Sequence, residues 1–405
     1  MDTTTMDTND AEAAGQRPYR LDPQELPAGL AHGPSRSFLV RDGLPGRGAF
    51  LDFGDLAADG PAVYEPGGEG AGPLYLLGET DYFPHIAFSG SSVVLDGATG
   101  EVHLAERVDG GLRRDLLASD LPALAALIHE TEAVAPAARQ PDAYGGLRGP
   151  AVVAQVIAAA GRRMRAIDPR LYDGAAPPAH WDTALRVRAL CWGAGPGGPG
   201  GLRYELDPGL VAEIAALTDE GAVRRYVEAE LPAGLTHTPT RRLLTEVGLP
   251  LGGWMFAVHE GPLLTMAEEY PEYFGEADGP QDEAEERDYQ RDYFALASWP
   301  TDLEVALDGA TGRLELPDWY DDGEPAAYLN RDLSALLYAL WTYERLREEW
   351  DRWEDGGPWA VFDPRALLHS AVDAAVAAVD PEAFATPGHS WQLLADDAHA
   401  GGLLS

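Results

Sequence analysis

The stretch Leu95-Asp96-Gly97-Ala98-Thr99-Gly100 occurs a second time, 212 residues later, as Leu307-Asp308-Gly309-Ala310-Thr311-Gly312. Apolar residues precede and follow both copies, with Leu303, Val305 and Leu307 alternating before the second. A short loop rich in Asp and Gly between two such runs predicts a β-hairpin, because glycine adopts positive φ cheaply and Asp bonds the backbone of its own turn. The chain is therefore expected to contain the same hairpin twice.

The duplication extends on both sides of the hairpin. Upstream, Gly43-Leu44-Pro45 returns as Gly248-Leu249-Pro250, and in each copy the preceding residues predict a short helix that ends at the glycine. Downstream, Ile167-Asp168-Pro169 returns as Val379-Asp380-Pro381. Each of these follows a stretch predicted to be helical and rich in alanine, Val152–Ala166 in one copy and Ala366–Ala378 in the other.

An amphipathic helix is predicted after the second hairpin. Its apolar residues follow the i, i+3, i+4, i+7 spacing and are Leu333, Leu336, Leu337 and Leu340. Asn330 is the expected N-cap of this helix, and Trp341 is expected to pack inward.

These repeats divide nearly the whole chain into two tandem units. We expect a disordered tail over residues 1–18, a first unit over residues 19–202 and a second over residues 203–405, with Gly193–Gly201 as a flexible linker at the boundary. Strands grouped together and flanked by helices predict an α+β fold in each unit, with an antiparallel sheet.

The second copy is seven residues longer between its Gly-Leu-Pro and its hairpin. The extra length falls in or near Glu268–Tyr293, a segment dense in Asp and Glu. This composition predicts an exposed acidic excursion.

The chain has 405 residues and a formal net charge of −38, with no lysine and one cysteine. A surface this negative repels nucleic acid and anionic lipid and attracts basic partners. Met1–Gln16 lacks the features of a signal peptide, and no apolar run is long enough to span a bilayer. We therefore expect a soluble cytoplasmic protein that binds neither nucleic acid nor membrane.

The common catalytic motifs are missing from the sequence. Without lysine, neither a P-loop nor a lysine Schiff base can form. No Gly-x-Ser-x-Gly elbow occurs, and neither His129-Glu130 nor His259-Glu260 continues into His-Glu-x-x-His. We expect no catalytic residue, no cofactor and no metal site.

One acidic cluster with aromatic residues follows the second hairpin. One hypothesis is a calcium loop, although the spacing does not fit an EF-hand. A second is a solvated face. A third is a surface for a basic protein, in which rings bury area and carboxylates pair with Arg and Lys. We assign the partner-binding surface to this cluster together with three residues of the acidic excursion: Asp318, Trp319, Tyr320, Asp321, Asp322, Glu324, Glu268, Glu269 and Glu272.

The order of these motifs resembles the SUKH superfamily, and most closely its fourth subfamily, the immunity proteins of bacterial toxin systems. In the second unit the residues that carry the resemblance are Thr245–Pro250, Leu307–Gly312 and Leu329-Asn330-Arg331-Asp332-Leu333. The first unit departs from the pattern, with Ala118 in the place of the asparagine. The resemblance covers about residues 34–134 and 239–352.

The resemblance implies a twisted antiparallel sheet braced by helices and a protein that binds a toxin domain without catalysis. Toxins neutralised by this superfamily are commonly nucleases or nucleic-acid deaminases, which need a basic surface to hold nucleic acid. The function expected first is therefore that of an immunity protein for a cognate basic toxin. A non-catalytic scaffold or regulatory module is the alternative, and a metal-dependent hydrolase is the third hypothesis.

Overall fold

The computed structural model describes residues 18–67, 72–81, 91–109, 111–134, 144, 149–174, 178–194, 201–218, 221–253, 255–274, 288–300, 303–317, 327–353, 361–362, 364–385 and 391. By its contacts the chain divides into two compact units. The first consists of Met1–Ala135, Gln155–Ala189 and Trp353–Ser370, and the second of Pro136–Ala154, Leu190–Arg352 and Ala371–Ser405. Each unit thus includes segments from both sequence copies. The boundary expected between residues 202 and 203 separates the two sequence copies, not the two compact units, and it stays a prediction. The tail expected over residues 1–18 lies almost entirely outside the described residues.

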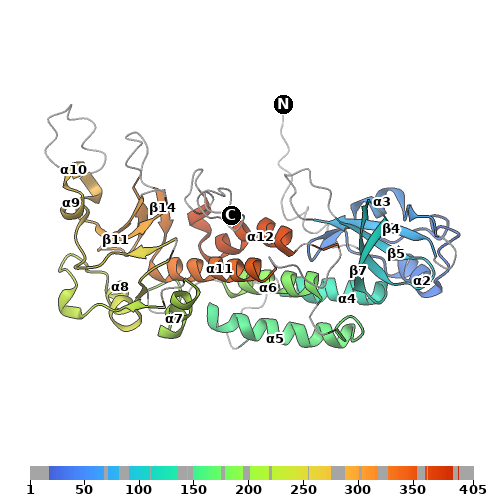
Figure 1. Ribbon diagram of the computed structural model, residues 1–405, viewed down its shortest axis with the longest axis horizontal. Helices are drawn as coiled ribbons and strands as arrows, with labels where there is room; N and C mark the ends of the chain where they lie inside the picture. Colours follow the sequence, from blue (N-terminus) through green and yellow to red (C-terminus); the bar gives the residue numbers. More distant parts are fainter. Residues whose placement is uncertain are drawn as a thin grey trace, which may run out of the picture. The chain divides into compact units, whose positions relative to one another are not determined.

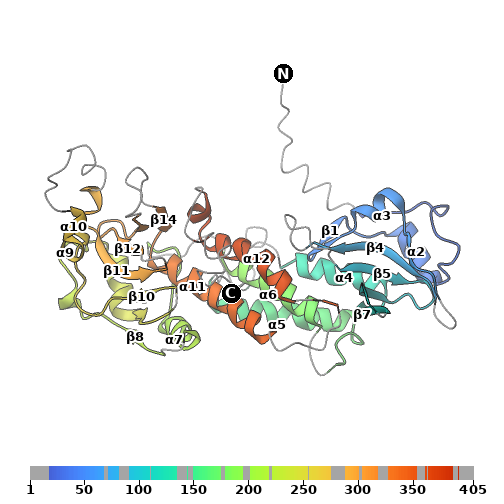
Figure 2. The same cartoon turned by 45° about the horizontal axis from the view of Figure 1, so that its top comes forward.

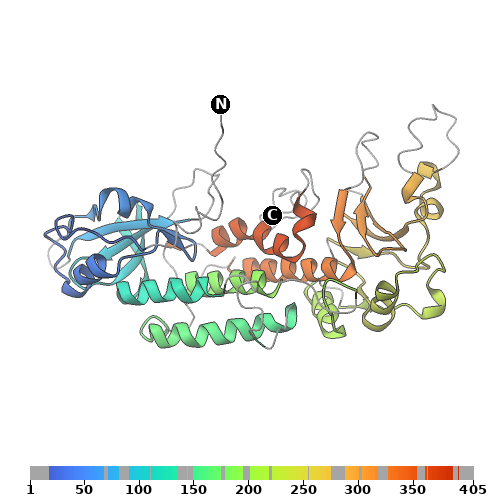
Figure 3. The ribbon, with the colours of Figure 1, turned by 180° about the vertical axis from the view of Figure 1, so that it is seen from behind.

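The first copy builds an antiparallel sheet in the order β1-β2-β4-β5-β6-β7, with β3 paired to β4. Helices α2 and α4 contact each other and lie on the same side of this sheet (Figure 3). The elements of this copy are α2 (Gly33–Arg41), β1 (Arg47–Gly48), β2 (Leu51–Asp52), α3 (Gly54–Asp59), β3 (Val63–Glu65), β4 (Leu74–Thr80), β5 (Ser92–Asp96), β6 (Val102–Val108), β7 (Gly111–Ala118), α4 (Leu121–Glu132), α5 (Pro150–Ile167) and α6 (Ala179–Gly193).

The second copy builds an antiparallel sheet in the order β10-β11-β12-β13-β14, and β8 pairs with β9 beside it. Figure 1 labels its α-helices and the strands β11 and β14, and Figure 2 also labels β8, β10 and β12. The elements of this copy are α7 (Pro208–Leu217), β8 (Val223–Arg224), η3 (Glu228–Glu230), α8 (Thr238–Arg242), η4 (Leu243–Val247), β9 (Leu249–Pro250), β10 (Ala257–Val258), α9 (Met266–Glu269), α10 (Pro271–Phe274), η5 (Asp288–Gln290), β11 (Phe294–Trp299), β12 (Leu303–Leu307), β13 (Leu314–Leu316), β14 (Ala327–Asn330), α11 (Leu333–Arg352), α12 (Pro364–Val379) and η6 (Pro381–Phe384). The predicted α+β fold with antiparallel sheets is confirmed.

Both predicted hairpins are confirmed. In the first copy β5 pairs with β6 across the Asp-Gly loop, and in the second copy β12 pairs with β13. Asp96 Oδ1 accepts a hydrogen bond from the Ala98 amide at 2.8 Å, and Asp308 Oδ1 accepts the same bond from Ala310 at 2.8 Å. The aspartates are therefore turn formers, as their position in the loop predicts.

A second local device is also built twice. The residues directly before α2 and α8 are both histidines. The Nδ1 atom of each lies 2.8 Å from a hydroxyl three residues later, Ser35 for His32 and Thr240 for His237. In both copies the histidine amide donates to a carbonyl of the hairpin loop. Equivalent contacts of this kind show that the helix and the hairpin meet in the same way in each copy.

The predicted helices after the hairpins are confirmed, but the predicted N-cap of α11 is wrong. Trp341 is buried, as expected. Asp332, and not Asn330, caps the helix, since its Oδ1 accepts bonds from the amides of Ser334 at 2.9 Å and Ala335 at 3.1 Å. Asn330 ends β14, where its Oδ1 accepts a bond from Trp391 Nε1 at 3.3 Å. The Asn330 side chain is therefore bonded to Trp391, which is distant in the sequence, and it does not cap α11.

The expected acidic excursion lies partly outside the described residues, in the stretch 275–287. Its described part is more than an exposed loop, because α9 and α10 bury apolar side chains against the second sheet. Met266 and Phe274 pack with Ala295 of β11 and Ala306 of β12. Figure 2 shows α9 and α10 on the side of the second sheet away from α11.

Candidate partner-binding face

The second sheet turns one face toward α9, α10 and η5, which together we call the insert. We call this face of the sheet the outer face. Strand alternation places Glu304 and Ala306 of β12 on it, opposite to Val305. The strand register extends the outer face to β13 and β14, because Ala306 pairs with Glu315 and Glu315 pairs with Tyr328. Two carboxylates therefore stand on a sheet face that the insert covers.

Glu304 is 2% exposed, and its carboxylate is held from three sides. Oε2 accepts from the Tyr270 hydroxyl at 2.7 Å and lies 2.7 Å from His259 Nε2. Oε1 accepts from the Ala297 amide at 3.0 Å. Burial, with the bond to Glu304, raises the pKa of the Tyr270 phenol. A buried carboxylate must be paired or hydrogen-bonded, so this network ties α9, which Tyr270 follows directly, to the sheet.

Glu315 is the second buried carboxylate of the outer face, with a side chain 5% exposed. Its Oε2 accepts from Gln290 Nε2 at 2.8 Å and from the Tyr289 hydroxyl at 3.1 Å, and its Oε1 lies 3.1 Å from Arg313 Nε. Burial and the charge of Glu315 raise the pKa of Tyr289. Burial is also the main reason that the pKa of Tyr293 is raised to about 12. This network fixes η5 on the sheet.

The outside of the insert is acidic and aromatic. Glu268, Glu269 and Glu272 are exposed, and Tyr273 and Tyr289 are 42% and 50% exposed. We call these five residues the acidic ridge. Glu268 also closes a capping box with Thr265, whose amide donates to it at 2.9 Å, and this bond lowers the pKa of the Glu268 carboxyl. The ridge is thus a surface on ordered elements.

The structure brings three of the predicted binding residues together on α9 and α10: Glu268, Glu269 and Glu272. The other six lie in the stretch 318–326, outside the described residues. Sequence reasoning missed Tyr273 and Tyr289, and it missed the two carboxylates beneath them. The signal for those carboxylates was present, since Leu-Glu-Val-Ala-Leu and Leu-Glu-Leu each place a glutamate inside an apolar strand.

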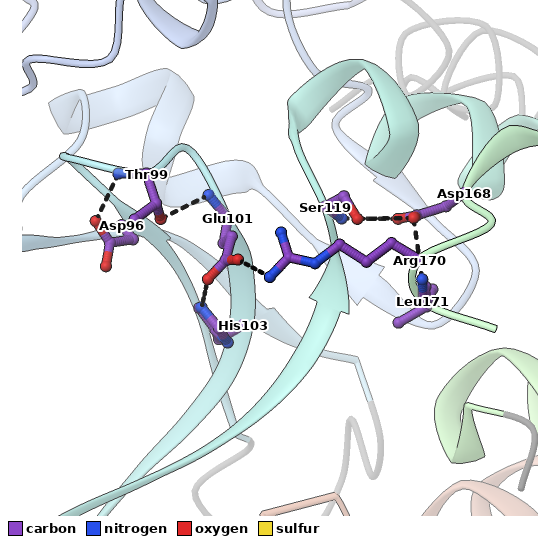
Figure 4. Close-up of polar contacts among 8 residues, drawn as sticks. All are labelled: Asp96, Thr99, Glu101, His103, Ser119, Asp168, Arg170 and Leu171. Carbon is purple, nitrogen blue, oxygen red and sulfur yellow. Dashed lines mark hydrogen bonds and ion pairs between the residues drawn. The ribbon is translucent and has the colours of Figure 1, made fainter. Parts of the chain in front are cut away.

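The corresponding face of the first copy has a different chemistry. Ser92 and His103 stand 212 residues before Glu304 and Glu315. Burial lowers the pKa of His103, whose Nε2 lies 3.5 Å from Glu101 Oε2. Glu101 in turn forms an ion pair with Arg170 (Figure 4). Buried carboxylates on the outer face are therefore a feature of the second copy.

An open pocket of about 500 Å³, lined in part by Arg170, lies between the start of α4 and the end of α5. The buried polar group in its lining is Asp168, which accepts bonds from the Ser119 amide and hydroxyl at 2.7 Å and from the Leu171 amide at 3.1 Å (Figure 4). Asp380 accepts the equivalent bond from the Arg331 amide at 2.8 Å in the second copy. Because the same contact recurs, Asp168 acts as a structural clamp between helix ends.

Among the described residues, no group of three or more His, Cys, Asp and Glu side chains is arranged to hold a metal ion. Within the same part of the chain, no helix has the length and apolar character that a bilayer crossing requires.

Comparison with protein families finds a match to the SUKH-4 immunity protein family over residues 8–186 and 210–397. This chain belongs to the SUKH-4 immunity protein family. The two matched segments agree with the tandem copies seen in the sequence and the fold. Immunity proteins bind and neutralise cognate toxins. No curated protein and no solved structure matches the chain.

The Glu304 network of this SUKH-4 protein predicts a pH-dependent contribution to stability. The bond to Glu304 raises the pKa of His259, with Glu269 adding to the rise and burial and Arg224 opposing it. A group whose pKa is higher in the folded than in the unfolded state stabilises the fold below its unfolded pKa, about 6.5, and loses that effect as pH rises through the folded value. We expect His259→Gln to destabilise the chain more at pH 6 than at pH 8.5.

The measurement is urea unfolding of the original chain and of His259→Gln across this pH range. At each pH, the free energy of unfolding of the variant is subtracted from that of the original chain. This subtraction cancels the contribution of titrating groups that both chains share. A difference that is constant, or that grows with pH, would contradict the assignment.

Proposed function

We propose that this chain neutralises its toxin by stoichiometric protein–protein inhibition, without chemistry of its own, and that the toxin is a nuclease or a nucleic-acid deaminase. Family membership supports a toxin as the partner. The acidic ridge is the observation that carries the rest of the proposal. A toxin that acts on nucleic acid holds its substrate on a basic surface, and an acidic surface with exposed rings complements it.

The ridge is suited to this role by its construction. Its carboxylates lie on the short helices α9 and α10, which the buried Glu304 and the apolar contacts of Met266 and Phe274 fix to the sheet. A fixed surface loses little conformational entropy on binding. The exposed rings of Tyr273 and Tyr289 supply apolar area among the charges, as is common at the centres of interfaces. We also propose the described Glu268, Glu269 and Glu272 and the sequence cluster Asp318–Glu324 as parts of one partner-binding surface.

The partner can be identified first by purifying the full chain from its native cell and sequencing what remains bound at low salt. A toxin domain encoded beside the gene for this chain is the expected partner. Recovery of a housekeeping complex in its place would favour the scaffold alternative.

Charge removal from the ridge tests the assignment. We expect Glu268→Gln, Glu269→Gln and Glu272→Gln together to slow association with the toxin domain roughly ten-fold at low salt, because rim charges act mainly on the association rate. Glutamine keeps the capping box with Thr265, so the fold is preserved. The rates are measured by stopped flow from low to high ionic strength, where the difference should shrink.

A matched control removes three exposed charges from the first copy, with Asp42→Asn, Asp59→Asn and Glu106→Gln. It makes the same change in net charge and should have a much smaller effect. A second variant neutralises Asp318, Asp321, Asp322 and Glu324. If both this variant and the ridge variant associate at the original rate and bind as tightly, the surface has been assigned wrongly.

A further inference from the structure

Tyr289 is a ridge residue that is exposed and also held in place by its hydroxyl. Half of its surface, 50%, is open to solvent. Its hydroxyl donates to the buried Glu315 at 3.1 Å, and its ring meets the edge of Tyr293 at a centroid distance of 5.8 Å. A ring fixed from two sides in this way presents its remaining surface in one orientation, so binding costs it little entropy.

The same face already holds a guanidinium group on a tyrosine. Arg313 lies over the ring of Tyr328, with its Cζ 5.0 Å from the ring centroid, and its Nε is 3.1 Å from Glu315. A cation over an aromatic face is attracted by the ring quadrupole, and a nearby carboxylate adds to the attraction. Glu315 therefore supports one arginine–tyrosine pair within the chain while its other oxygen holds the hydroxyl of Tyr289.

The chemistry around Tyr289 favours a second cation from outside. A phenol that donates to a carboxylate gains electron density in its ring, which strengthens attraction for a cation. The exposed carboxylates of α9 lie on an adjacent segment, because backbone bonds join Met266 to Tyr293 at 2.7 Å and Ala267 to Arg291 at 3.2 Å. Arginine suits such a site better than lysine, since its planar group stacks on a ring and pairs with a carboxylate together.

We propose that Tyr289 is the anchor of the toxin-binding surface and that it receives an arginine side chain from the basic partner. This inference rests on the proposed function, which supplies the partner. The described residues of the first copy include no equivalent pair of buried carboxylates on the corresponding sheet face, so the anchor belongs to the second copy.

Three variants of the full chain test the anchor, with the toxin domain as the probe. Tyr289→Leu removes the ring, and we expect Kd to rise about five-fold or more. Tyr289→Phe keeps the ring and removes the bond to Glu315, and we expect a rise of about two-fold. Ser298→Ala alters an exposed residue of β11 and should leave Kd unchanged. Circular dichroism and hydrogen exchange over β11–β13 establish that each variant is folded.

The outcomes separate the two proposals. Failure of the unaltered chain to bind any basic toxin domain overturns the proposed function, and the anchor with it. Binding that Tyr289→Leu leaves at the original Kd, in a folded variant, overturns the anchor alone and leaves the function standing.

Two peptides test the preference for arginine directly. The full chain is labelled with 3-fluorotyrosine, and the Tyr289 resonance is assigned by its loss in Tyr289→Phe. We expect acetyl-(Gly-Arg)₃-amide to shift this resonance at a concentration about three-fold lower than acetyl-(Gly-Lys)₃-amide does. Equal effects of the two peptides, or a resonance that neither peptide moves, would overturn the assignment of arginine.

Discussion

Replacement of Trp181 by alanine is expected to lower the free energy of unfolding of the first compact unit by about 4 kcal/mol, the usual cost of emptying a buried tryptophan site. Trp181 lies on α6 with its side chain fully buried. Its Nε1 donates to the Leu117 carbonyl at the end of β7, at 2.8 Å, and its ring meets the edge of His180 at 4.9 Å. The substitution therefore opens a cavity and leaves a buried carbonyl without its donor.

Hydrogen exchange of peptides from β5, β6 and β7 measures this loss where it occurs, because global unfolding of a chain with two units need not be two-state. Trp181→Phe serves as the control. It keeps most of the ring volume and removes only the donor, so about 2 kcal/mol should be lost. A loss below about 1 kcal/mol for Trp181→Ala would mean that the site collapses or is not packed as described.

Alanine at Gly248 is expected to cost about 3 kcal/mol, and alanine at Gly43 a similar amount, since each combines backbone strain with a steric clash. Their φ angles are +92° and +75°. A Cβ at Gly248 would lie 2.5 Å from the Arg224 carbonyl oxygen, and one at Gly43 would lie 2.0 Å from the Tyr19 carbonyl oxygen. Both oxygens belong to the backbone of a paired segment, so neither can move away cheaply.

Two other glycines separate strain from clash. Gly261 has a φ of +105°, and no atom lies within 4 Å of the position that a Cβ would take, so Gly261→Ala should cost about 1 kcal/mol from strain alone. Gly33 begins α2 with open space around it, and Gly33→Ala should be neutral within about 0.5 kcal/mol. Hydrogen exchange of peptides around each glycine, which reports local unfolding, gives the comparison of the four variants. Equal costs at Gly248 and Gly261 would show that the clash is relieved by movement.

The amino-acid sequence by itself determined the repeated features of this protein. The hairpins at Asp96 and Asp308, the helix ends at Gly43 and Gly248 and the alanine-rich helices that precede Asp168 and Asp380 could be predicted. Each depends on neighbours a few residues away, where turn chemistry and apolar spacing act directly. The family could be inferred from the order of the same local motifs.

Only the tertiary structure decided how the outer face of the second copy is built. Strand alternation predicts that Glu304 points away from Val305, but its partner Tyr270 is 34 residues distant, and Tyr289 is 26 residues from Glu315. The cap of α11 was mispredicted for the same reason, because Trp391, 61 residues away, holds Asn330. Contacts between residues this far apart depend on how strands and helices pack. The spacing of residues along the sequence does not reveal this packing.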